Sequence, residues 1–214
     1  MRISLQRHFL LISLAFVCLA YAPNQKVNST QNVSIDTTKT GLFSIPYFSP
    51  EPLNNPVLVL VLHGDSPFNN PSYQYGIAKR IAEENDNVVA VGILRPGYKD
   101  EEGNRSEGKR GKTTGDNYTR EVLAAINGLV SELKDKFNPT KVVLVGHSGG
   151  AAISANLLAE YPDTYAAALL IACPCDLKKW RAHMKALQPR AKVWDKEVSS
   201  LSPIEEVDRM DDSA

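Results

Sequence analysis

The sequence predicts an α/β fold in which a mostly parallel sheet carries helices on both faces. Short apolar and β-branched runs at 57–62, 88–94, 142–145 and 166–172 alternate with segments of helical periodicity. Such runs are typical of parallel strands that are buried on both faces. Alternating strand and helix signals indicate consecutive βαβ units, and 214 residues are enough for one domain.

The predicted elements follow one another without internal repeats. Residues 42–48 predict an early strand, and 73–84 predict a helix with one apolar face. Residues 96–115 form a long polar loop with five glycines, a length that is often functional in a compact domain. The strongest helix signal covers 116–137, and Asn138-Pro139 ends it.

The N-terminus resembles an export signal. Two arginines precede an almost wholly apolar stretch at 9–19, and Ala20-Tyr21-Ala22 has the small-residue spacing of a cleavage site. We expect a signal peptide at 1–22, a polar leader at 23–40 and a secreted or periplasmic protein. The apolar stretch is shorter than the roughly 20 residues of a spanning helix, so no stable membrane span is expected after cleavage. An N-terminal membrane anchor is the alternative.

Charge and cysteine content exclude several classes of partner. The chain has 24 basic and 24 acidic residues, so its net charge does not favour binding to nucleic acid. Export would permit oxidation of Cys173 and Cys175, but a bridge across one residue is strained. We therefore expect two small apolar side chains near a strand end. No further ligands lie at metal-binding spacing, and no cofactor is implied.

The segment Gly146-His147-Ser148-Gly149-Gly150 follows a buried strand and opens a small-residue helix. This is the context in which G-x-S-x-G forms a nucleophile elbow, although a plain glycine-rich turn is the alternative. The serine adopts a strained backbone, so Gly146 and Gly150 on either side must be small. We expect Ser148 as nucleophile, with the Gly149 N–H directed at developing negative charge.

A second turn supports this interpretation. The first buried strand ends in His63-Gly64-Asp65. An oxyanion hole takes one N–H from the residue after the serine and one from the loop after this strand, so Asp65 N–H is the second predicted donor. We expect His63 and His147 to shape the two turns and not to act as bases.

Three segments together resemble the α/β-hydrolase superfamily: 62–67, 94–98 and the elbow at 146–150. Within it, the chain resembles esterases and prolyl-oligopeptidase-like serine hydrolases over residues 42–210. The resemblance implies cleavage of a small-molecule ester or a peptide through an acyl-Ser148 intermediate. Specificity is expected to lie in the 96–115 loop and in a cap near Trp180.

The superfamily orders its triad as serine, acid, histidine, and the partners of Ser148 are hard to find. Only His183 follows the serine, within the basic helical stretch of a cap-like segment at 176–198, where we do not expect a base. Asp176 is a candidate acid after the third buried strand. Ser202 and Glu205 predict a helix start with a capping box, as in the segment that leads to the family's acid-bearing strand.

The run at 166–172 is composed for a strand with neighbours on both sides. Without a later strand it would be an exposed apolar sheet edge. We therefore expect 41–214 to be an incomplete hydrolase domain that lacks its last strands, truncated at the C-terminus and impaired in catalysis. A non-catalytic remnant or binding protein with this fold is the alternative.

Overall fold

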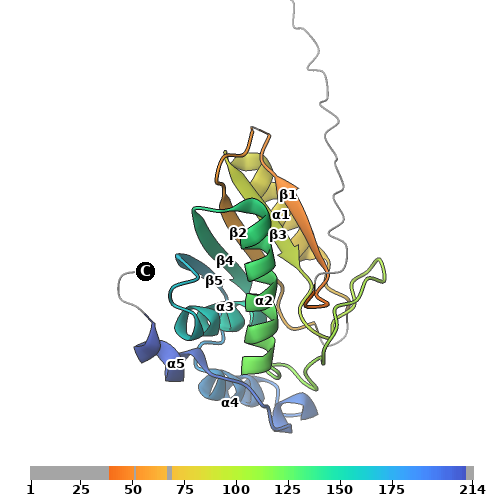
Figure 1. Ribbon diagram of the computed structural model, residues 1–214. Helices are drawn as coiled ribbons and strands as arrows, with labels where there is room; N and C mark the ends of the chain where they lie inside the picture. Colours follow the sequence, from red (N-terminus) through yellow and green to blue (C-terminus); the bar gives the residue numbers. More distant parts are fainter. Residues whose placement is uncertain (1–38, 51, 67–68, 211–214) are drawn as a thin grey trace, which may run out of the picture. The chain divides into compact units, whose positions relative to one another are not determined.

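A computed structural model describes residues 39–50, 52–66 and 69–210 (Figure 1). The predicted signal peptide and nearly all of the predicted leader lie outside these residues. The strands are β1 (Ser44–Phe48), β2 (Val57–Leu62), β3 (Val88–Ile93), β4 (Lys141–His147) and β5 (Ala167–Ile171). They form one sheet in the order β1-β3-β2-β4-β5. Only β1 pairs antiparallel, so the mostly parallel sheet is confirmed.

The helices cover both faces of this sheet. They are α1 (Tyr73–Glu84), α2 (Arg120–Phe137), α3 (Gly149–Glu160), α4 (Leu177–Leu187) and the short α5 (Pro203–Glu206). Two 3₁₀ turns, Lys192–Asp195 and Val207–Arg209, lie after α4 and α5. Figure 1 shows α2 on one face and α1 on the opposite face.

The central strand β2 explains this layering. Its residues alternate between two apolar clusters, with Leu58, Leu60 and Leu62 packing beside side chains of α2 and α3. Val59 and Val61 pack with α1 on the other face. Because side chains alternate along a strand, a continuous apolar run is the composition of a strand covered on both faces.

The helix predicted from 116 begins only at Arg120. The reason is that the buried Asp116 carboxylate accepts the backbone N–H groups of Lys112 and Ser199, at 2.8 Å each. These bonds tie two loops together and keep Asp116 outside the helix. The local apolar periodicity carries no information about such long-range partners.

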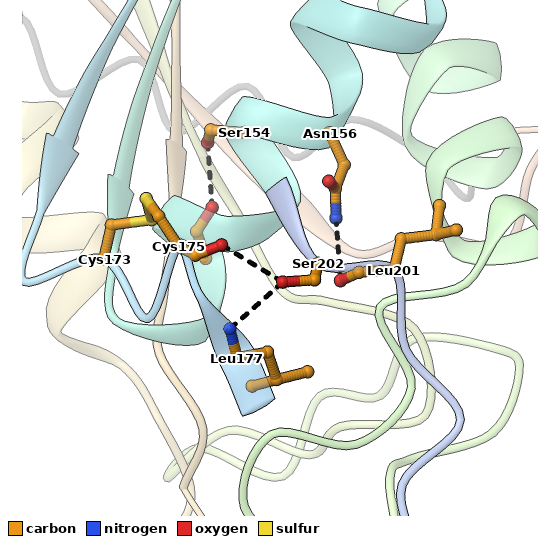
Figure 2. The surroundings of a disulfide bond; sticks show 8 residues. Ser154, Asn156, Cys173, Cys175, Leu177, Leu201 and Ser202 are labelled. Atoms are coloured by element: carbon orange, nitrogen blue, oxygen red, sulfur yellow. Dashed lines mark hydrogen bonds between the residues drawn. A yellow bond between two sulfur atoms is a disulfide. The ribbon is translucent and has the colours of Figure 1, made fainter. Parts of the chain in front are cut away.

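The prediction that Cys173 and Cys175 are two separate apolar side chains is wrong, because they form a disulfide (Figure 2). Their Cα atoms are 5.1 Å apart, within the ordinary range for a bridge. The chain turns directly after β5, where Ala172 has a φ of 51°.

The disulfide loop also holds the C-terminal segment. Ser202 Oγ donates to the Cys175 carbonyl and accepts the Leu177 N–H (Figure 2). The Ile204 N–H donates to the same carbonyl. A helix does begin after Ser202, but its side chain makes no capping bond. The predicted capping box is therefore wrong, because the hydroxyl is used at the start of α4.

The predicted exposed sheet edge is confirmed. Within the described sheet, β5 pairs with β4 alone. Leu169 is 57% exposed, and Leu170 and Ile171 are also exposed. Across the described ranges, no helix is long and apolar enough to cross a bilayer.

Candidate active site

The turn between β4 and α3 has the geometry of a nucleophile elbow. Ser148 adopts φ 53° and ψ −117°, a conformation that is strained for a residue with a Cβ. A Cβ on Gly146 would lie 2.4 Å from the Gly150 carbonyl oxygen, and one on Gly150 would lie 2.4 Å from the Leu62 carbonyl oxygen. Only glycine fits at both positions. The turn places Ser148 at the carboxyl end of the parallel strands.

The turn at 63–65 lies directly against this elbow. A Cβ on Gly64 would be 3.0 Å from Ser148 Cβ. The Gly64 N–H donates to the hydroxyl of Tyr73 at 2.6 Å, and that hydroxyl lies 2.8 Å from His147 Nδ1. Tyr73, in the first turn of α1, thus joins both turns of the site. The sequence does not single out Tyr73, because a tyrosine at a helix start has no distinctive pattern.

His63 is fully buried and both of its ring nitrogens are engaged. Arg95 N–H donates to Nε2 at 3.0 Å, so Nδ1 carries the proton and donates to the Gly64 carbonyl at 2.7 Å. Burial, followed by the charge of Arg95, holds the pKa of His63 well below its usual value. A neutral imidazole with both nitrogens bonded shapes the turn and is not available as a base.

The Asp65 carboxylate is the centre of a buried polar cluster. It accepts hydrogen bonds from Arg95 Nη1 at 3.0 Å, Tyr118 Oη at 2.7 Å and Gly115 N at 2.6 Å. A Cβ on Gly149 would lie 2.4 Å from Asp65 Oδ1, so the carboxylate packs against the elbow. The Arg95 guanidinium offsets the negative charge. Burial, followed by the charge of the Asp65 carboxylate, raises the pKa of Tyr118.

The backbone N–H groups of Asp65 and Gly149 remain for a ligand. Asp65 N–H donates to no described residue, and Gly149 is the first residue of α3, where helix N–H groups lack an intrahelical acceptor. The structure therefore brings Ser148, Gly64, Asp65 and Gly149 together. The partners of the Asp65 carboxylate come from positions 30 to 53 residues away and could not be foreseen from spacing.

The remaining predicted partners have other contacts. Asp176 caps α4: its carboxylate accepts the Lys179 N–H at 3.0 Å and pairs with Lys179 Nζ at 2.9 Å. These bonds lower the pKa of Asp176. His183 is exposed on α4. No histidine of the described ranges hydrogen-bonds Ser148, and the same residues contain no group of His, Cys, Asp and Glu that could hold a metal ion.

Family comparison matches residues 99–211 to the family model described as serine aminopeptidase, S33. This match covers more than half of the 214-residue chain. The chain belongs to the serine aminopeptidase S33 family. It is thereby a member of the α/β-hydrolase superfamily, as the sequence motifs indicated. No curated protein matches it.

Solved structures agree on the fold. Est1E from Butyrivibrio proteoclasticus, with ferulic acid bound, has 18% identity and a TM-score of 0.50 over 70% of this chain and 55% of its own. The Pyrococcus furiosus esterase Pf2001 has 15% identity and a TM-score of 0.55 over 79% and 62%. The chain thus spans less than two thirds of the length of either protein. At these identities the likeness shows the α/β-hydrolase fold.

Proposed function

We propose that this chain carries the nucleophile and the oxyanion donors of a serine hydrolase that cleaves an ester or amide bond. The observation that carries the proposal is Ser148 on a strained turn at the carboxyl end of β4, beside the Asp65 and Gly149 N–H groups. Because the nucleophile and the oxyanion donors are in place before a substrate binds, this arrangement favours acyl transfer.

The reaction proceeds in two halves. Ser148 Oγ attacks the carbonyl carbon and gives its proton to a base, while the two N–H groups hold the oxyanion. Collapse of the tetrahedral intermediate breaks the bond to the alcohol or amine, which leaves with that proton. Water then attacks the acyl-serine, releases the acid and restores the hydroxyl.

The base is the part that these residues do not supply. His63 has both nitrogens bonded, His147 shares Nδ1 with Tyr73, and His183 is exposed without a bond to Ser148. We therefore propose that the 214-residue chain by itself is impaired. The same observation favours the second candidate, a non-catalytic protein that keeps the fold.

Labelling with a fluorophosphonate, followed by mass spectrometry of the intact protein, separates the two candidates. We expect slow modification of Ser148 that added imidazole accelerates by at least about 10-fold, because a general base contributes roughly 10²–10⁴. Ser148→Ala should abolish labelling. Ser199→Ala, at an exposed serine, is the matched control and should label normally.

Each other outcome is informative. Rapid labelling without imidazole would refute the impaired state, since the chain would then contain a working base. Absence of labelling even with imidazole would refute the hydrolase proposal and support the non-catalytic protein.

We also propose that the chain works in an oxidising compartment, either outside the cell or in the periplasm. The Cys173–Cys175 disulfide supports this, because such bonds persist mainly in exported proteins. Alkylation and mass spectrometry of protein isolated from its native source should find both thiols blocked. Free thiols there would contradict the proposal.

A further inference from the structure

A small cavity lies beside the 63–65 turn and is not used by the proposed chemistry. Its volume is about 60 Å³, and it is lined by Asp65, Tyr98, Arg110, Gly111, Lys112 and Thr113. On this measure one water molecule takes about 10–15 Å³. The cavity therefore accommodates a group of a few heavy atoms.

Three side chains that line the cavity, those of Arg110, Tyr98 and the exposed Lys112, have no acceptor among the described residues. Arg110 Nη2 is buried and has no hydrogen-bond partner. Tyr98 is only 5% exposed, and its hydroxyl donates to no residue that the structure describes. Neither Arg110 nor Lys112 forms an ion pair with a described carboxylate. A buried donor without a partner is costly, so Arg110 Nη2 calls for an acceptor in the cavity.

The other lining groups do not supply that acceptor. The Asp65 carboxylate already receives the guanidinium of Arg95, the Tyr118 hydroxyl and an amide N–H. Thr113 Oγ1 donates to the Val193 carbonyl at 2.9 Å. Because the Asp65 carboxylate already accepts three hydrogen bonds, and because Arg110 and Lys112 have no ion-pair partner among the described residues, the cavity favours an anion.

The cavity wall is also held in place before any ligand arrives. The Arg110 guanidinium lies 4.5 Å from the centroid of the Tyr98 ring. Lys112 N–H donates to Asp116, and Asn117 Nδ2 donates to the Lys109 carbonyl at 2.6 Å. Donors that are already ordered lose little entropy on binding, which increases affinity.

We propose that this cavity binds a carboxylate of the substrate, so that the preferred substrates are esters or amides with a free carboxylate group. The planar guanidinium fork of Arg110 matches a carboxylate, and the Tyr98 hydroxyl adds a neutral donor. Asp65 connects the two sites, because it packs against Gly149 of the elbow and also lines the cavity. That the bound carboxylate belongs to a substrate rests on the proposed function, whereas the carboxylate-binding site itself does not depend on it.

Binding of glutarate to the whole chain, measured by NMR titration or calorimetry, tests the proposal without relying on catalysis. We expect saturable binding of glutarate at least about 10-fold tighter than that of its neutral analogue glutaramide, because charge-assisted hydrogen bonds are roughly twice as strong as neutral ones. Arg110→Gln should weaken glutarate binding by about 10-fold or more, and Tyr98→Phe by several-fold. Lys109→Gln, an exposed lysine in the same loop, is the matched control and should bind like the parent.

Ser148→Ala separates this proposal from the hydrolase proposal: it should lose fluorophosphonate labelling and keep glutarate binding. Thermal unfolding of each variant checks its fold. If Arg110→Gln does not fold, Tyr98→Phe decides, since it keeps the ring that packs on His63. No saturable binding, equal binding of glutaramide or inorganic phosphate, or unchanged binding in the folded variants would overturn the carboxylate site.

Discussion

Replacing Ser148 by glycine and by alanine tests whether the elbow stores backbone strain. Ser148 has φ 53° and ψ −117°, and its Cβ is the atom that makes this conformation unfavourable. Alanine keeps the Cβ and removes only the hydroxyl. Glycine removes both, so the difference between the two variants isolates the strain.

The magnitude follows from three contributions. A non-glycine residue in such a region costs about 1–3 kcal/mol. Glycine forfeits about 0.4–1 kcal/mol through the greater freedom of the unfolded chain. It also loses part of the roughly 0.8 kcal/mol of a buried methyl group, because Ser148 is only half-buried beside Gly64. We expect Ser148→Gly to be more stable than Ser148→Ala by about 1 kcal/mol.

Urea denaturation monitored by circular dichroism measures this difference, with equal m-values as a check that the unfolded states are comparable. The sign of this difference decides the test, since glycine normally destabilises a folded protein relative to alanine. If Ser148→Ala were the more stable variant, the turn would not be strained and the elbow geometry would be refuted. Both variants should fail to react with a fluorophosphonate.

Three further perturbations test the surroundings of the site. Tyr118→Phe removes one hydrogen bond to the buried Asp65 carboxylate and should lower the free energy of unfolding by about 1.5–3 kcal/mol in urea denaturation; a loss near zero would show that the bond contributes nothing. Because burial lowers the pKa of His63 in the folded state, only the unfolded chain gains its proton just below pH 6.5. As the pH decreases below 6.5, the free energy of unfolding should therefore decrease by up to about 1.4 kcal/mol per pH unit more than in His63→Gln. Parallel pH profiles of the two proteins would contradict this. Reduction of the Cys173–Cys175 disulfide should cost only about 1.5 kcal/mol, because it closes a very short loop; guanidinium denaturation with and without reductant measures the loss, and global unfolding on reduction would contradict it.

The fold was predictable because its signals are local. The run at 57–62 has no polar residue, so both faces of β2 had to be covered, and the structure places helices on both. The elements at 57–62 and 73–84 have the expected bounds for the same reason. The start of α2 was misplaced because Asp116 binds loop N–H groups that lie in other parts of the chain.

The disulfide was missed for a related reason. Spacing alone argues against a bridge between Cys173 and Cys175, but the backbone conformation at Pro174 sets the 5.1 Å between their Cα atoms. The sequence contains the cysteines and not the backbone path. Likewise, Ser202 had the pattern of a helix cap, yet its hydroxyl serves Cys175 and Leu177.

The sequence by itself determined the position of the elbow, because the glycines around Ser148 answer a steric requirement of five consecutive residues. It also determined that β5 is composed for neighbours on both sides, since its residues are apolar throughout. Only the tertiary structure decided what surrounds the Asp65 carboxylate and which donors in the adjacent cavity lack partners. These properties depend on distances between residues that are far apart in the chain, and such distances exist only after folding.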